Sequence, residues 1–70
     1  MIDIKLIIDE LDDARSGLND SRNAAEEWRN GKVAGVDLTA EQKSALKTTF
    51  KKGIQTCKDG LVAIDMELSN

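Results

Sequence analysis

The sequence lacks several residue types on which enzymes and small stable domains commonly depend. Histidine, proline and tyrosine are absent, and the 70 residues include one cysteine, one phenylalanine and one tryptophan. Without histidine, no ordinary side chain exchanges protons near neutral pH, and no glycine-rich phosphate-binding loop is present. A single cysteine cannot form an internal disulfide or, without histidine, a zinc site. We therefore expect a protein that is not an enzyme and that holds no metal or cofactor.

Long apolar runs are also missing. The longest is Leu6-Ile7-Ile8, far shorter than a membrane span. The segment Met1–Lys5 has no basic region followed by an apolar stretch, so we expect neither a signal peptide nor a membrane anchor. Charged residues make up 33% of the chain and the net charge is −3. This composition favours solvated helices in a small acidic cytoplasmic protein.

The main positive feature is an apolar stripe with a rhythm of three and four residues. Seven residues for every two turns keep one face of a helix against a partner helix, so this rhythm predicts helix pairing. In the first half of the chain the stripe is Ile4, Ile7, Leu11, Ala14, Leu18, Ser21, Ala25 and Trp28. In the second half it is Leu46, Phe50, Ile54, Cys57, Leu61, Ile64 and Leu68.

Capping residues place the helix ends. Asp3 is a suitable N-cap, and Gly31 suits the left-handed residue that follows a helix. These signals predict a helix over residues 3–30, a connector over 31–38 and a helix over 39–68. For the first residues, the alternation of apolar side chains from Ile2 to Ile8 leaves a short strand as the alternative.

The second helix has a capping box, because Thr39 is followed three residues later by Gln42. In the connector, we expect Val33, Val36 and Leu38 to fold back over the end of the helix pair, where Trp28 lies. If Trp28 is instead exposed, it would be a suitable anchor for a partner.

Two helices of equal length, each roughly 40 Å long, favour an antiparallel hairpin. A bend near residue 35 brings together positions whose numbers add to about 70, and it places Gly17 opposite Gly53. These glycines either permit close approach of the two backbones or are tolerated defects, since each costs a helix about 1 kcal/mol. The same register predicts ion pairs of Glu26 and Glu27 with Lys43, of Asp20 with Lys51, and of Asp12 and Asp13 with Lys58.

A single two-helix hairpin has no enclosed interior, so part of each stripe would face water. We therefore predict an all-α fold, with residues 1–70 forming a single-domain antiparallel two-helix hairpin. We expect two hairpins to dimerise into a four-helix bundle. The alternative is that a larger protein partner covers the exposed part of the stripes. The function expected is that of a non-catalytic interaction protein, an assembly adaptor or an inhibitor. The predicted oligomer or partner interface is Ile4, Ile7, Leu11, Leu18, Trp28, Leu46, Phe50, Ile54, Cys57, Leu61 and Ile64.

A row of lysines supports a second hypothesis. Lys43, Lys47, Lys51 and Lys58 fall along one side of the second helix, where they could follow a phosphate backbone. In length and plan the chain resembles the Rop family of dimeric helical hairpins, which bind paired RNA loops; that resemblance implies nucleic-acid binding as the alternative function. Residues 38–47 are similar in style to small phage-encoded helical proteins, which implies a location in the host cytoplasm.

Overall fold

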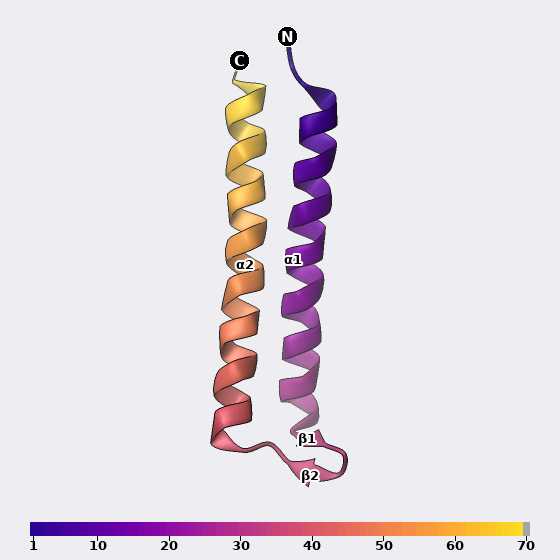
Figure 1. The fold of residues 1–70 in the computed structure, drawn as a ribbon, viewed down its shortest axis with the longest axis vertical. Coiled ribbons are helices and arrows are strands. Elements are labelled where there is room, and N and C mark those ends of the chain that lie inside the picture. Colours follow the sequence, from indigo (N-terminus) through magenta and orange to yellow (C-terminus); the bar gives the residue numbers. More distant parts are fainter. Residues whose placement is uncertain (70) are drawn as a thin grey trace.

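Two long antiparallel helices make up most of the structure, a computed structural model that describes residues 1–69 (Figure 1). Helix α1 spans Ile4–Asn30 and helix α2 spans Ala40–Leu68. Between them lie two short strands, β1 (Lys32–Val33) and β2 (Val36–Asp37). Both termini lie at one end of the hairpin and the connector at the other (Figure 1). The predicted all-α helical hairpin is confirmed.

The helix ends follow the predicted caps. The Asp3 carboxylate accepts a hydrogen bond from the backbone N–H of Leu6 at 3.1 Å, and Gly31 ends α1 with a φ of 69°. At the start of α2, the Gln42 N–H donates to the Thr39 hydroxyl at 3.1 Å, and the Thr39 N–H donates to the Gln42 side chain at 2.8 Å. The alternative of a strand at the N-terminus is wrong, because the chain is helical from residue 4 onward.

The connector contains a β-hairpin that the sequence did not predict. Val33 pairs with Val36 across a two-residue turn in which Ala34 and Gly35 both have positive φ, 51° and 79°. Such a turn matches the twist of the strands, but its usual sequence signal is Asn-Gly, which is absent here. Of the three apolar connector residues, only Leu38 is buried, and its N–H donates to the Gly31 carbonyl at 3.0 Å. Val33 and Val36 remain exposed, which corrects their predicted packing over the helix ends.

Small residues form the contact between the two helices. The buried positions of α1 are Ala14, Gly17, Ser21 and Ala24, and those of α2 are Gly53, Gly60 and Ile64. Three large members of the predicted α1 stripe are exposed, Leu11 and Leu18 at 49% each and Trp28 at 46%, whereas Ile7 is half-buried. The expected rhythm is correct, but the contact is turned toward the small residues, because only they let the backbones come close.

The approach is closest where Gly17 faces Gly53, as the register predicted. A Cβ atom on Gly17 would lie 2.6 Å from the Gly53 carbonyl oxygen. A Cβ atom on Gly53 would overlap the Gly17 carbonyl oxygen and the Ser21 hydroxyl. That hydroxyl donates to the Phe50 carbonyl oxygen at 2.7 Å, which joins the two helices at the same level. The glycines are therefore required by close packing and are not tolerated defects.

Gly53→Ala tests this contact. Alanine would favour the helix by about 1 kcal/mol, but its methyl group has no space, so we expect the free energy of unfolding to fall by about 1–3 kcal/mol. Urea unfolding followed by circular dichroism measures the change. Gly60→Ala is the matched control, because a Cβ atom there would lie 3.1 Å from the Glu10 carbonyl oxygen, and we expect a smaller loss. A more stable Gly53→Ala variant would contradict the close approach.

Ala34→Asn tests the turn of the connector. Asparagine tolerates positive φ better than alanine and gives the preferred Asn-Gly pair, so we expect a gain of about 0.5–1 kcal/mol. The midpoint temperature of thermal unfolding should rise by a few degrees. The control is Ala45→Asn at an exposed position of α2, which should lower stability because asparagine is a weaker helix former. Loss of stability in Ala34→Asn would contradict the turn.

Candidate functional site

Each helix has a row of residues at seven-residue spacing beside the small-residue contact. In paired helices this spacing returns each residue to the same side of the helix. The rows are Ile4, Leu11, Leu18 and Ala25 on α1, and Lys47, Ile54, Leu61 and Leu68 on α2. All of these side chains are exposed except Ile54, which is half-buried.

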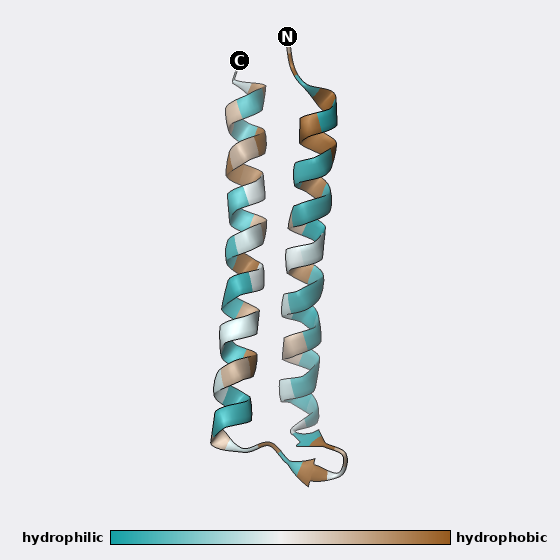
Figure 2. Cartoon of the chain, viewed as in Figure 1, coloured by the Kyte–Doolittle hydropathy of each residue, from teal (hydrophilic) through white to brown (hydrophobic). Residues whose placement is uncertain are grey.

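The two rows lie on the same side of the hairpin. Ala25 and Lys47, one from each row, line a single pocket. Because Gly17 faces Gly53, the two rows also run level with each other, so that Leu18 lies at the level of Ile54. We call this surface the apolar face: Ile4, Leu11, Leu18, Ala25, Trp28, Phe50, Ile54, Leu61 and Leu68. Along the two helices, Figure 2 shows that hydrophobic residues are densest near the end that carries the termini.

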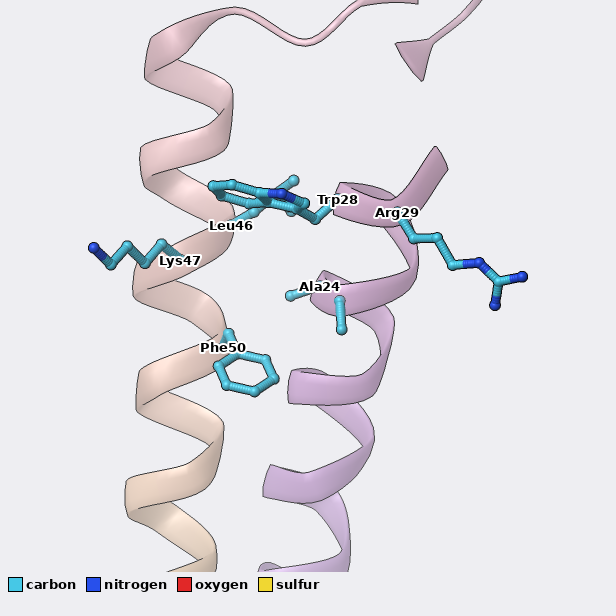
Figure 3. Close-up of a pocket in the computed structure, with 7 residues that line it drawn as sticks. Ala24, Trp28, Arg29, Leu46, Lys47 and Phe50 are labelled. Atoms are coloured by element: carbon cyan, nitrogen blue, oxygen red, sulfur yellow. The ribbon is translucent and has the colours of Figure 1, made fainter. Parts of the chain in front are cut away.

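The connector end of the apolar face holds both aromatic residues. Trp28 of α1 lies across toward α2 beside Leu46, and Phe50 lies about one helical turn further along α2 (Figure 3). Together with Ala24 and Ala25 they line a pocket of about 290 Å³. Trp28 is thus exposed at the side of the hairpin and does not cover its end. This is the arrangement expected of an anchor for a partner.

The strip between the two rows is less exposed than the rows themselves. At the middle of the hairpin it consists of small side chains, Ala14 and Ser21, which are buried, and Cys57, which is half-buried. Toward the termini it continues with Ile7, half-buried, and Ile64, 9% exposed. Two rows of larger side chains therefore stand on either side of a strip of smaller ones.

The predicted interface residues divide by exposure. Ile4, Leu11, Leu18, Trp28, Phe50 and Leu61 are exposed; Ile7, Leu46, Ile54 and Cys57 are half-buried; Ile64 is buried. Leu68 and Ala25 belong to the same face but were not in the predicted interface. Their seven-residue spacing from Leu61 and Leu18 is the signal that could have found them.

Cations border the apolar face on both helices. Arg15 and Arg22 line a hollow beside Leu18 on α1, and Lys51 and Lys58 line one beside Phe50 and Ile54 on α2. At the connector end, Arg29 extends outward from α1 and Lys47 outward from α2, with the aromatic residues between them (Figure 3). We call these six residues, Arg15, Arg22, Arg29, Lys47, Lys51 and Lys58, the basic rim.

The predicted ion pairs between the helices do not form. Among residues 1–69 the ion pairs are Arg22–Glu26 within α1, at 3.2 Å, and Lys32–Asp37 across the β-hairpin, at 4.0 Å. The reason is the rotation of α1. Asp13 lines a hollow with Thr56 on the opposite side of the hairpin, and Asp20 and Glu27 follow Asp13 at seven-residue spacing. These three acids are thus turned away from Lys51 and Lys58, while Glu26 pairs with Arg22 and Asp12 lines the hollow beside Arg15.

Across residues 1–69, no group of three or more Cys, Asp or Glu side chains is placed to hold a metal ion. Neither helix, over the same residues, has a stretch long and apolar enough to cross a membrane. Comparison with protein-family models, curated protein sequences and solved structures finds no significant match to this chain.

Because Leu18 is exposed and Ile64 is buried, we expect a charge at these two positions to affect folding differently. Leu18→Asp adds a charge at an exposed site, so we expect the hairpin to remain helical. Ile64→Asp places the same charge at a buried site, where an unpaired carboxylate is costly, so we expect most of the helicity to be lost. Circular dichroism at low protein concentration checks both. Equal loss of helicity in the two variants would mean that Leu18 belongs to the contact between the helices.

Proposed function

We propose that this protein is a non-catalytic interaction protein, an assembly adaptor or inhibitor, that packs its apolar face against helices of a second copy or of a larger protein. The observation that carries the proposal is the open apolar face. A globular protein of 7.7 kDa has about 4,300 Å² of accessible surface, whereas this chain has 5506 Å². The excess is about 1,200 Å². Among residues 1–69 fifteen large hydrophobic residues are exposed, and seven of them lie on the apolar face.

The dimensions of the face support the same proposal. The hairpin is 16 Å across in its wider short dimension, and the paired helices run side by side for roughly 40 Å. A flat surface of that size has about 640 Å², and side-chain relief raises it toward the roughly 800 Å² per partner of a stable protein interface. The seven-residue spacing of the rows is suited to another helix, whose side chains would fit between theirs. A second copy in this position would complete a four-helix bundle.

Two measurements test the proposal. The first is sedimentation equilibrium over a wide concentration range, at low and high salt, and the second is binding of a dye specific for apolar surface. We expect the chain either to associate or to bind the dye as a monomer, since the face must be covered by protein or left open. A folded monomer that binds no dye at any concentration would refute the proposal. Leu18→Asp should weaken self-association, or dye binding by the monomer, at least tenfold. Asn23→Asp adds the same charge at an exposed position well away from the two rows and should change neither.

Nucleic-acid binding is the second candidate, and one observation favours it. The lysine row of Lys43, Lys47, Lys51 and Lys58 is exposed, and none of these residues makes an ion pair among residues 1–69. Their charges are therefore available to phosphates.

Replacing Lys43, Lys47 and Lys51 together by Glu should abolish any gel shift of RNA or DNA, while the fold is weakened by about 1 kcal/mol or less. Gel shifts at low salt, where phosphate binding is strongest, decide the matter. No shift by the unmodified chain under those conditions would remove this candidate.

A further inference from the structure

The charge around the apolar face differs from the charge of the chain as a whole. The net charge is −3, yet six of the ten basic residues form the basic rim. Acids enter the rim at three places: Glu26 pairs with Arg22, Asp12 lines the hollow beside Arg15, and Asp65 follows Lys58 at seven-residue spacing on α2. Cations predominate at the connector end, around the two aromatic residues.

A second copy would place like charges against each other. If two hairpins stack face to face and point the same way, the α1 edge of each copy lies over the α2 edge of the other. If they point in opposite ways, α1 lies over α1 and α2 over α2. In both cases a basic edge meets a basic edge, because arginines border the face on α1 and lysines border it on α2. Like charges facing each other across an interface select against a partner.

We propose that the apolar face is occupied by an amphipathic helix of another protein, one whose apolar stripe is flanked by Asp and Glu. This proposal rests on the proposed function and names the chemistry of the partner. Carboxylates on both sides of such a helix would lie against the arginines of α1 and the lysines of α2. The two charge patterns are thus complementary along both edges.

The shape of the face favours a helix over other acidic partners. The rows of larger side chains stand on either side of small ones, Ala14, Ser21 and Cys57, so a third helix can lie along this strip between Leu18 and Ile54. The pocket between Trp28 and Phe50 has space for a large apolar side chain. A nucleic acid would leave the apolar rows uncovered, and a fluid lipid surface makes no use of a fixed pocket.

Two designed peptides test the proposal on the full chain. Both are 28-residue helices without tryptophan that carry leucine at positions a and d of four heptads; one has Glu at the flanking e and g positions and the other has Lys. Trp28 is the only tryptophan and lines the pocket, so its fluorescence reports binding. At low salt we expect the Glu peptide to bind at least tenfold more tightly than the Lys peptide. The ratio should approach one at high salt, because salt screens the rim.

Adjacent lysines provide a matched pair of variants. Lys51 borders Phe50 and Ile54, whereas Lys52 is exposed and, being one residue on, lies about 100° further around α2. We expect Lys51→Glu to weaken binding of the Glu peptide at least fivefold and Lys52→Glu to weaken it less than twofold. Helicity should be unchanged in both variants. Equal effects of the two variants would overturn the proposal, because the preference would then follow net charge and not the rim.

The remaining outcomes separate this inference from the proposed function. Equal binding of both peptides at low salt, tight self-association at low salt, or tighter binding of anionic lipid vesicles than of the Glu peptide would each overturn the acidic-helix partner. The first two would leave an interaction protein in place. Failure of either peptide to bind, in a monomer that also binds no dye, would overturn both proposals.

Discussion

Close contact between two helix backbones at Gly17 and Gly53 determines the rest of this structure. The carbonyl of each glycine occupies the space that a side chain on the other would need, and the Ser21 hydroxyl joins the helices through the Phe50 carbonyl. At this level there is no room for large side chains between the helices, and the large buried residue of the contact, Ile64, lies further toward the termini. The leucines and isoleucines at neighbouring positions of the stripe are therefore displaced to one side. The apolar face is a direct consequence of small-residue packing.

The same contact explains the shape of the molecule. The radius of gyration is 15.8 Å, whereas a globular chain of this length has about 11 Å. Small residues bury little apolar area, and the hydrophobic residues buried here are Ala14, Ala24, Leu38 and Ile64. Each Å² of buried apolar area stabilises the fold by about 25 cal/mol, so this contact contributes little stabilisation per helical turn. Capping hydrogen bonds and the β-hairpin contribute a larger share of the stability than they would in a domain with a full core.

The sequence predicted the arrangement of the helices better than their rotation. Asp3, Gly31 and the Thr39–Gln42 capping box marked helix ends, because caps are local and depend on a few side chains. Register followed from helix length and from the two facing glycines. Rotation was harder, since the predicted stripe and the small-residue row share Ala14 and Ser21 and both have a seven-residue rhythm. Only close backbone packing selects between them, and that depends on both helices at once. The β-hairpin gave no signal because Ala34 occupies a conformation usually taken by Asn or Gly.

A protein bound to the apolar face would add to the stability of the hairpin. A domain of 70 residues is stable by roughly 3.5–10 kcal/mol, and the narrow contact between α1 and α2 places this hairpin toward the lower part of that range. A partner present at 100 times its dissociation constant would stabilise the state that it binds by about 2.7 kcal/mol. Because the apolar face exists only when Gly17 and Gly53 are in contact, all of that free energy favours the folded hairpin. In the complex proposed above, the basic rim would select the partner, and the close glycine contact would hold the two rows at a fixed spacing.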